Sequence, residues 1–316
     1  MLTLIGRPLP QRPVMMLHYT LPPLLTFLVL FVACVQPEAG TLPPDTPDVD
    51  LSDTAEDASE PKDTSAPEDV SDDDAEAIPD VQDTPPPEPW PCDPELDLND
   101  RRYRHLHGLS DAQIQRGLLN MVSGHRALYY STARQHLMND IEPHDDGSIE
   151  CAYTGRITEP DGSTTPDGFN TEHVWPQSRG ADQEPPRSDI HHLFAVDGGV
   201  NSARSNHPYG TTSCSGNSCP WHENGSERGP STDGRDPVFE VRPEFRGNVA
   251  RAMFYFALRY QMPIEDREEA VLRQWHCEDP PDDYERNRND LIQMLQSNRN
   301  PFIDRPDFVD NFDSFD

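Results

Sequence analysis

Residues 35–91 limit what this chain of 316 residues can fold into. The segment holds 18 acidic residues against one base, Lys62, and most of its other residues are Pro, Ser and Thr. Charge repulsion and proline keep such a segment extended, and it has too little apolar surface to form a packed core. We therefore expect a disordered acidic tether here and a folded domain confined to residues 92–316.

The N-terminus has the pattern of an export signal. Arg7 and Arg12 precede the apolar run LPPLLTFLVLFVAC, which is short for a membrane span and ends at Cys34. Small residues before a single cysteine resemble a bacterial lipoprotein cleavage site. We expect residues 1–34 to be a signal peptide of this type, with the lipid on Cys34 and the protein on the cell envelope or surface. The alternative is an ordinary signal peptide cleaved near Ala39, which would leave the protein periplasmic or extracellular.

Five cysteines lie beyond the tether, and export favours disulfides over free thiols. Cys214 and Cys219, in CSGNSC, are the preferred disulfide pair because they are close in sequence. With His222 they could instead supply three zinc ligands, but the disulfide is favoured in an exported protein. Because five is an odd number, we expect one thiol to stay free.

Apolar residues at helical spacing indicate three helices around a buried core. The first begins at a capping box formed by Ser110 and Gln113. The third carries an unusual charged residue, Arg288, on its core face. The stripes are Ile114, Leu118, Met121 and Val122, then Val249, Ala252, Met253, Phe256, Ala257 and Tyr260, then Tyr284, Leu291, Ile292 and Leu295. Residues 150–245 are rich in Gly, Pro, Ser and Asn, which indicates short strands and long loops.

Side chains with catalytic chemistry are concentrated in this middle segment. A strand carrying Glu172 and His173, a second strand HLFAV, a turn at Gly198-Gly199 and a short helix with Asn201 would form a β-β-α unit. Carboxylate and amide oxygens are hard ligands for Mg²⁺ or Ca²⁺, and a neutral imidazole can accept a proton from water. Adjacent strand residues point to opposite faces. The Glu-His pair can therefore serve one site only if the strand ends or bends there.

Five blocks of sequence in the right order resemble the bacterial endonuclease I family, whose members are secreted nucleases of low sequence specificity. The resemblance covers about residues 105–310. The blocks are NTEHVWPQS, SDIHHLFAVDGGVNSARSNHPYG, ARAMFYFALRY, WHCEDPPDDYERNRND and SNRNPFIDRPDF.

This resemblance implies an α+β fold in which a ββα-metal (His-Me finger) core is embedded in a mostly helical single domain with long loops. It implies that His173 is the general base and that Glu172 and Asn201 bind one divalent metal ion. Mg²⁺ is the first choice, with Ca²⁺ or Mn²⁺ as alternatives. The implied reaction is hydrolysis of DNA, with RNA as a further substrate, to 5′-phosphate ends.

The resemblance also implies an arginine that holds the cleaved phosphate, located between the Glu-His pair and HHLF. Arg179 and Arg187 both lie in that interval, and Arg204, beside Asn201, is a further candidate. We expect a monomer without a protein partner, held at the membrane by its lipid anchor.

The charge balance argues against tight nonspecific binding of nucleic acid. With the tether, Arg7 and Arg12 set aside, 39 acidic and 22 basic residues remain, a net charge of −17. All 22 bases are arginine, the side chain best suited to bidentate phosphate contact. We therefore expect a weakly binding, metal-dependent nuclease.

Two other functions are open from the sequence. One is a zinc hydrolase that uses Cys214 and Cys219 with histidines at positions 191, 192, 207 or 222. The other is a non-catalytic surface lipoprotein on the same scaffold. The presence of Glu172, His173 and Asn201 together argues against the second, since a degenerate copy would be expected to lose one of them.

Overall fold

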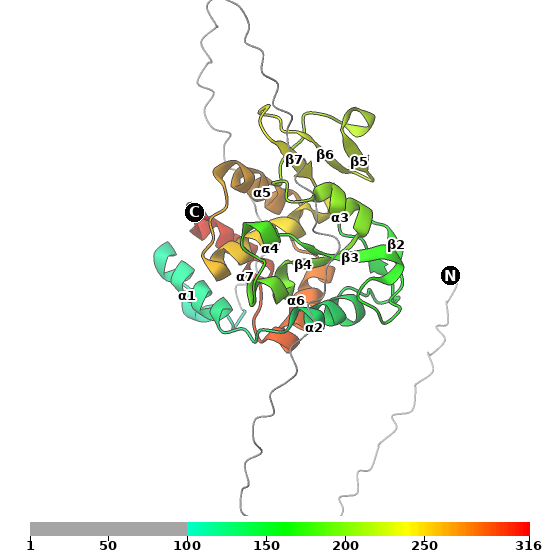
Figure 1. Cartoon of the computed structure of the whole chain (residues 1–316). Helices are drawn as coiled ribbons and strands as arrows, with labels where there is room; N and C mark the ends of the chain where they lie inside the picture. The colour runs from blue at the N-terminus through cyan, green and yellow to red at the C-terminus, as the bar shows by residue number, and fades with distance from the viewer. Residues whose placement is uncertain (1–99) are drawn as a thin grey trace, which may run out of the picture. The chain divides into compact units, whose positions relative to one another are not determined.

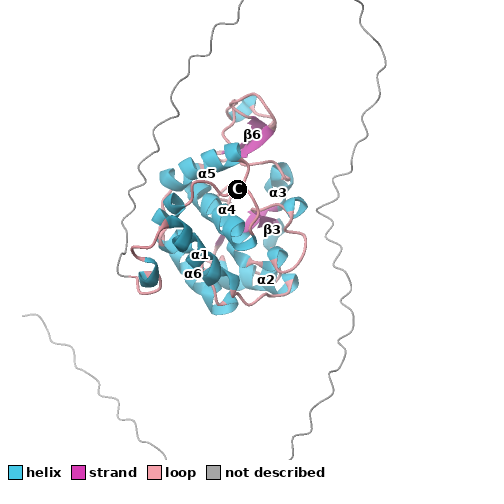
Figure 2. Ribbon diagram, turned by 90° about the vertical axis from the view of Figure 1, so that its left-hand side faces the viewer, coloured by secondary structure: helices cyan, strands magenta, loops and turns pink. Residues whose placement is uncertain are grey.

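Helix α4 (Arg246–Tyr260) crosses the centre of residues 100–316, the part of the chain that the computed structural model describes (Figure 1, Figure 2). Every residue from 247 to 258 is buried, so the stripe predicted from sequence extends around the whole helix. The charged residue in that run, Arg251, donates from Nε to Oε1 of Glu285 at 2.8 Å. Neighbouring helices thus cover α4 on all sides, and its charge is paired.

The helices predicted from sequence are α1, α4 and α6. At the start of α1, the side chain of Gln113 accepts a hydrogen bond from the Ser110 N–H at 3.1 Å, as expected for a capping box. Helices α1, α5 and α7 contact α4, and α6 contacts α7. The α-helices other than α4 are α1 (Asp111–Ser123), α2 (Tyr130–His136), α3 (Gly198–Arg204), α5 (Asp266–Glu278), α6 (Asp283–Gln296) and α7 (Pro301–Asp304).

Arg288 lies on the core face of α6 because an acidic residue is buried with it. Its Nε donates to Oε1 of Glu142 at 3.0 Å, and its Nη2 donates to the carbonyl of Ile190 at 2.9 Å. Both charged side chains are almost fully buried. The ion pair therefore ties α6 to the segment around Glu142, and the hydrogen bond to Ile190 ties it to the segment that leads into strand β4 (Leu193–Asp197).

The strands form three small antiparallel sheets, which together with the helices make the fold α+β, as predicted. The sheets contain β1 (Ile149–Glu150) with β2 (Ile157–Thr158), β3 (Phe169–His173) with β4 (Leu193–Asp197), and β5 (Trp221–Glu223), β6 (Ser226–Pro230) and β7 (Pro237–Glu240) in that order. The Cys214–Cys219 disulfide that the spacing favoured precedes β5.

Strands β3 and β4 and helix α3 follow one another in space as the sequence predicted. Glu172 pairs with Phe194 across the sheet, and α3 contacts both strands. One detail of the prediction was wrong, because Gly198 and Gly199 form the first turn of α3 and not a turn before it. The cause is the N-cap residue Asp197, whose side chain accepts from the Gly199 N–H at 2.7 Å.

The expected export signal, the lipid-bearing Cys34 and the acidic tether lie outside the described residues. Within residues 100–316, no helix is long and apolar enough to cross a membrane.

Candidate active site

Strand β3 ends at His173, so Glu172 and His173 occupy the last two positions of the strand. Their side chains contact different groups, as expected for neighbours in a strand. Glu172 is 2% exposed and lies against α3, whereas His173 is 6% exposed and lies against α2. The end of the strand is therefore flanked by a carboxylate on one side and an imidazole on the other.

A buried hydrogen-bonded cluster holds the carboxylate of Glu172. Its Oε1 accepts from the Tyr153 hydroxyl at 2.8 Å and lies 3.3 Å from Nε of Arg204. Arg204 is 1% exposed and donates from Nη2 to the Val174 carbonyl at 2.8 Å. The tyrosine and the arginine thus fix the orientation of the carboxylate and balance its charge.

Asn201 precedes Arg204 by three residues on α3, so both side chains lie on the same side of the helix. Since Arg204 contacts Glu172, that side of α3 faces the carboxylate. The Asn201 side chain is half-buried, and none of the residues described forms a hydrogen bond with its amide group. The amide oxygen of Asn201 is therefore available to a ligand on the Glu172 side of the strand end.

The imidazole of His173 is held in one tautomer. Its Nε2 lies 3.0 Å from the carbonyl oxygen of Arg187, and because a carbonyl only accepts, Nε2 carries the proton. Nδ1 then keeps its lone pair. Burial, together with the nearby His192, lowers the pKa of His173 well below 6.5, so the ring is neutral at pH 7.

The neighbouring histidines differ from His173 at Nδ1. The Nδ1 atoms of His191 and His192 are buried without a partner, whereas that of His173 is not among the buried unpartnered atoms. Burial lowers the pKa of His191 and of His192 to about 4. These two rings pack against Tyr255 and Phe256 of α4. Of the three imidazoles, only that of His173 presents a proton-accepting nitrogen that substrate or water can reach.

Asp189 anchors the segment that carries these histidines. Its buried Oδ2 accepts from the hydroxyls of Tyr255 and Tyr260, each at 2.8 Å, and its Oδ1 accepts from Nε2 of Gln296 at 2.9 Å. Burial alone would raise the pKa of Asp189, but the adjacent His191 and the hydrogen bond from Gln296 lower it to about 2. The segment before β4 is thereby fixed to α4 and α6.

The three candidate arginines lie in different surroundings. Arg179 donates to the buried carboxylate of Glu268 at 2.9 Å, and Arg204 is enclosed beside Glu172. Arg187 is half-buried and forms no ion pair with a carboxylate in the described part of the chain. Its guanidinium carbon lies 4.3 Å from the centre of the Tyr130 ring, beside His173.

Sequence reasoning missed the tyrosines that build this site. Tyr153 binds Glu172, and its hydroxyl also lies 2.7 Å from that of Tyr209. The ring of Tyr130 lies 5.4 Å from that of His173. All three lie 20 to 43 residues away from His173 in the chain, and no local pattern marks them.

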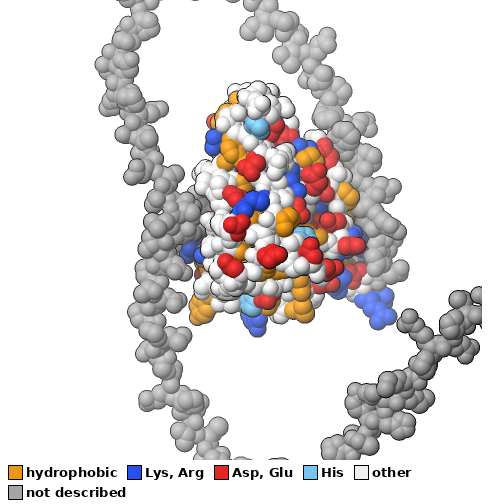
Figure 3. Space-filling view, turned by 90° about the vertical axis from the view of Figure 1, so that its right-hand side faces the viewer, with side chains coloured by type: hydrophobic (Ala, Val, Ile, Leu, Met, Phe, Trp, Pro, Cys, Tyr) orange, Lys and Arg blue, Asp and Glu red, His pale blue; other side chains and the backbone are white. Residues whose placement is uncertain are grey.

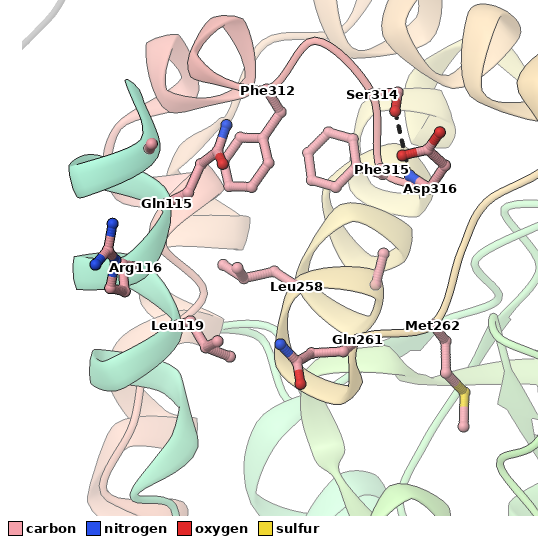
Figure 4. A pocket seen from close by; sticks show the side chains of 12 residues that line it. Gln115, Arg116, Leu119, Leu258, Gln261, Met262, Phe312, Ser314, Phe315 and Asp316 are labelled. Carbon is pink, nitrogen blue, oxygen red and sulfur yellow. Dashed lines mark hydrogen bonds between the residues drawn. The ribbon is translucent and has the colours of Figure 1, made fainter. Parts of the chain in front are cut away.

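A separate pocket lies at the C-terminus, between α1 and the end of α4 (Figure 4). Leu119, Leu258 and Phe315 supply apolar walls, and Gln261 and Asp316 lie at its edge. None of the predicted site residues lines it. Arg116, Ser314 and Asp316 also line it, so its walls are mixed in character, but it contains no histidine.

Comparison with known proteins identifies the family. The sequence model of the endonuclease I family matches residues 102–307, which include every residue of the β3 site. The chain belongs to the endonuclease I family. It is therefore a nuclease that hydrolyses phosphodiester bonds, and the resemblance seen in the sequence is confirmed. Nucleases of this family generally depend on a divalent metal ion.

The relatives of this endonuclease I include ribonucleases and deoxyribonucleases. An extracellular ribonuclease of Bacillus subtilis is 32% identical over 70% of this chain and 80% of its own length, and one of Bacillus amyloliquefaciens is 32% identical over 66% and 76%. A periplasmic deoxyribonuclease of Aeromonas hydrophila is 28% identical over 37% of this chain and 47% of its own.

The zinc alternative is not supported in this endonuclease I. Cys214 and Cys219 are joined in a disulfide and cannot act as thiolate ligands. Cys277 is also disulfide-bonded, and Cys151 is a buried free thiol. In residues 100–316, no three His, Cys, Asp or Glu side chains converge as metal ligands.

Proposed function

We propose that the chain is an exported, metal-dependent nuclease that cleaves RNA and DNA with little sequence specificity, leaving 5′-phosphate ends. Strands β3 and β4 and helix α3 are its ββα-metal core. The observation that carries this proposal is the tautomer of His173. With Nε2–H donated to the Arg187 carbonyl, Nδ1 is the nitrogen that accepts a proton from the attacking water.

Glu172 and Asn201 fit a hard divalent cation such as Mg²⁺. They supply one carboxylate and one amide oxygen, and Mg²⁺ commonly binds few protein ligands and keeps several waters. When bound, the metal ion stabilises the negative charge that develops on the phosphate and the leaving oxygen. Tyr153 and Arg204 hold Glu172 in place, so the carboxylate does not have to be reoriented when the ion binds.

Arg187 is the arginine that we assign to the phosphate. It lies beside His173 and has no described carboxylate as partner, whereas Arg179 is held by Glu268. Arg204 is a positioning residue, since its buried guanidinium binds Glu172 and the Val174 carbonyl. A planar guanidinium at the position of Arg187 can bind two phosphate oxygens at once.

Several further properties belong to the same proposal. Residues 1–34 direct export, Cys34 carries a lipid, and residues 35–91 hold a monomeric catalytic domain, residues 92–316, away from the membrane. The extracellular or periplasmic names of the relatives support export. RNA is the substrate of the relatives that match most of the chain, by their names, which supports RNA beside DNA.

The surface charge fits weak binding of a polyanion. On the face shown in Figure 3, acidic side chains are scattered between basic ones and no broad basic patch appears. Binding energy from neutralised phosphates is therefore small. Such an enzyme also releases its cleaved product readily.

Metal removal tests the proposed function. With excess EDTA, the purified protein should lose its nicking of a supercoiled plasmid and its cleavage of total RNA, because the developing phosphate charge is no longer stabilised. Adding Mg²⁺ back should restore both activities, which gel electrophoresis would show. Undiminished cleavage in EDTA would contradict the metal dependence, and no cleavage with Mg²⁺, Ca²⁺ or Mn²⁺ would contradict the nuclease proposal itself.

Substituting the two candidate arginines separates their roles. Arg187→Ala should lower kcat/KM by about 10²-fold, because it removes a positive charge next to the reacting phosphate. Arg179→Ala breaks the ion pair with Glu268 but should leave kcat/KM within about threefold. Initial rates on one labelled oligonucleotide would measure both. A larger loss of kcat/KM in the Arg179 variant than in the Arg187 variant would contradict the assignment of Arg187 to the phosphate.

A further inference from the structure

One aromatic side chain on the surface has no structural explanation. Tyr129 is 71% exposed, and the other strongly exposed large apolar residues described are Leu109, Ile157 and Met294, none of them aromatic. Tyr129 directly precedes Tyr130, whose ring lies 5.4 Å from that of His173. The exposed ring belongs to the residue directly before one that contacts His173, and it contributes little to the core.

The backbone on both sides of Tyr129 is held in place. The hydroxyl of Ser188 donates to the Leu128 carbonyl at 2.6 Å, and the Tyr130 N–H donates to the carboxylate of Glu184 at 3.2 Å. These contacts join the start of α2 to the loop that carries Arg187. A ring mounted on a fixed backbone loses little conformational entropy when a ligand packs on it.

Two arginines without ion pairs lie next to the neighbouring ring of Tyr130. The guanidinium carbons of Arg187 and Arg134 lie 4.3 and 5.6 Å from the centre of the Tyr130 ring. Neither forms an ion pair with a described carboxylate, whereas most arginines around the fold do. The Nε atoms of both are buried without a hydrogen-bond partner in residues 100–316. In an acidic domain, positive charge is thus left available for a ligand at the start of α2.

An exposed aromatic residue, followed by one whose ring contacts two guanidinium groups without ion pairs, matches the alternation of base and phosphate in a polynucleotide strand. Base–aromatic stacking requires a base with an open face, and it is tolerant of sequence because every base has one. Inside a duplex, the neighbouring base pairs cover both faces of each base. A ring at this place therefore favours unpaired nucleotides without choosing among the bases.

We propose that Tyr129 is a stacking platform for an unpaired nucleobase next to the cleaved phosphate, and that Arg134 contacts a neighbouring phosphate. The proposal rests on the proposed nuclease function and names its preferred substrate class, single-stranded polynucleotide. Tyr129 binds substrate and takes no part in the proton transfer at His173. Stacking persists through the reaction, so it lowers KM and leaves kcat almost unchanged.

The test compares Tyr129→Ala with Tyr129→Phe in the full chain. The substrates are a labelled single strand and the same sequence closed into a hairpin duplex. On the single strand, the Ala variant should raise KM about 5- to 100-fold with kcat within about twofold, and Phe should restore the wild-type KM. On the duplex, KM should change by less than about twofold. The matched control is Met294→Ala, at an equally exposed apolar residue on α6. This variant should keep the wild-type KM and kcat on both substrates.

Binding without cleavage separates this proposal from the nuclease proposal. Anisotropy of a fluorescent oligothymidylate would be measured with His173→Ala alone and with His173→Ala plus Tyr129→Ala. Weaker binding in the double variant supports the platform even if the catalytic assignment is wrong. Unchanged KM and unchanged binding in the Tyr129→Ala proteins would overturn the platform while metal-dependent cleavage persisted. An equal loss on strand and hairpin would overturn the preference for unpaired nucleotides.

Discussion

Replacing His173 with alanine is expected to lower kcat by about 10² to 10⁴, the contribution of a well-placed general base. The neighbouring His191 and His192 cannot take its place, because their Nδ1 atoms are buried. The rate would be measured on plasmid DNA and on RNA at saturating Mg²⁺. Both activities should fall together if one centre cleaves both substrates.

The control for this prediction is His222→Ala. His222 is exposed on β5, and its Nε2 lies 3.0 Å from the side chain of Asn217. It has no role in the proposed site. This variant should keep the wild-type rate, since surface substitutions away from functional groups have small effects. Full activity in a folded His173→Ala protein would remove the general base from the mechanism.

Substitution of the two proposed metal ligands is expected to separate catalysis from stability. Asn201→Ala should raise the Mg²⁺ concentration for half-maximal rate at least about tenfold. It should leave the free energy of unfolding unchanged, because none of the described residues bonds to the amide. Glu172→Gln should impair the metal dependence too, and also destabilise the fold by about 3–5 kcal/mol, because it leaves Arg204 buried without its carboxylate.

Urea unfolding and Mg²⁺ titration of the rate would measure both effects. The double variant Glu172→Gln, Arg204→Met is a matched control, because it removes both members of the buried pair. It should recover part of the lost stability without recovering activity. Equal destabilisation by Asn201→Ala and Glu172→Gln would contradict the separation, and an unchanged Mg²⁺ dependence in both would contradict their role as ligands.

Several features of the fold could be predicted from local sequence pattern. The capping box at Ser110, the apolar stripes of α1, α4 and α6, and the strand carrying the Glu-His pair could all be predicted from local pattern. Each depends on residues within a few positions of one another, where propensity and period decide the structure. The disulfide of Cys214 and Cys219 belongs to the same group, since only four residues separate them.

Local pattern did not explain the charged residues of the core. From the sequence, Arg288 is out of place on the core face of its helix. In the structure it pairs with Glu142, which lies 146 residues away in the chain. The same limit applies to Arg179, Arg187 and Arg204, which the sequence could not rank. Arg179 pairs with Glu268, Arg187 lies over the ring of Tyr130, and Arg204 pairs with Glu172.

The sequence by itself thus determined the family and the reaction, and predicted the Glu-His pair at the end of β3 as its reactive residues, because these follow from short blocks of adjacent residues. Only the tertiary structure decided which nitrogen of His173 carries its proton, that Arg187 lies against the Tyr130 ring, and that Tyr129 is exposed. The physical reason is that the position of a proton, the pairing of a charge and the exposure of a side chain depend on the groups that pack against it. Those contacts join residues far apart in the chain.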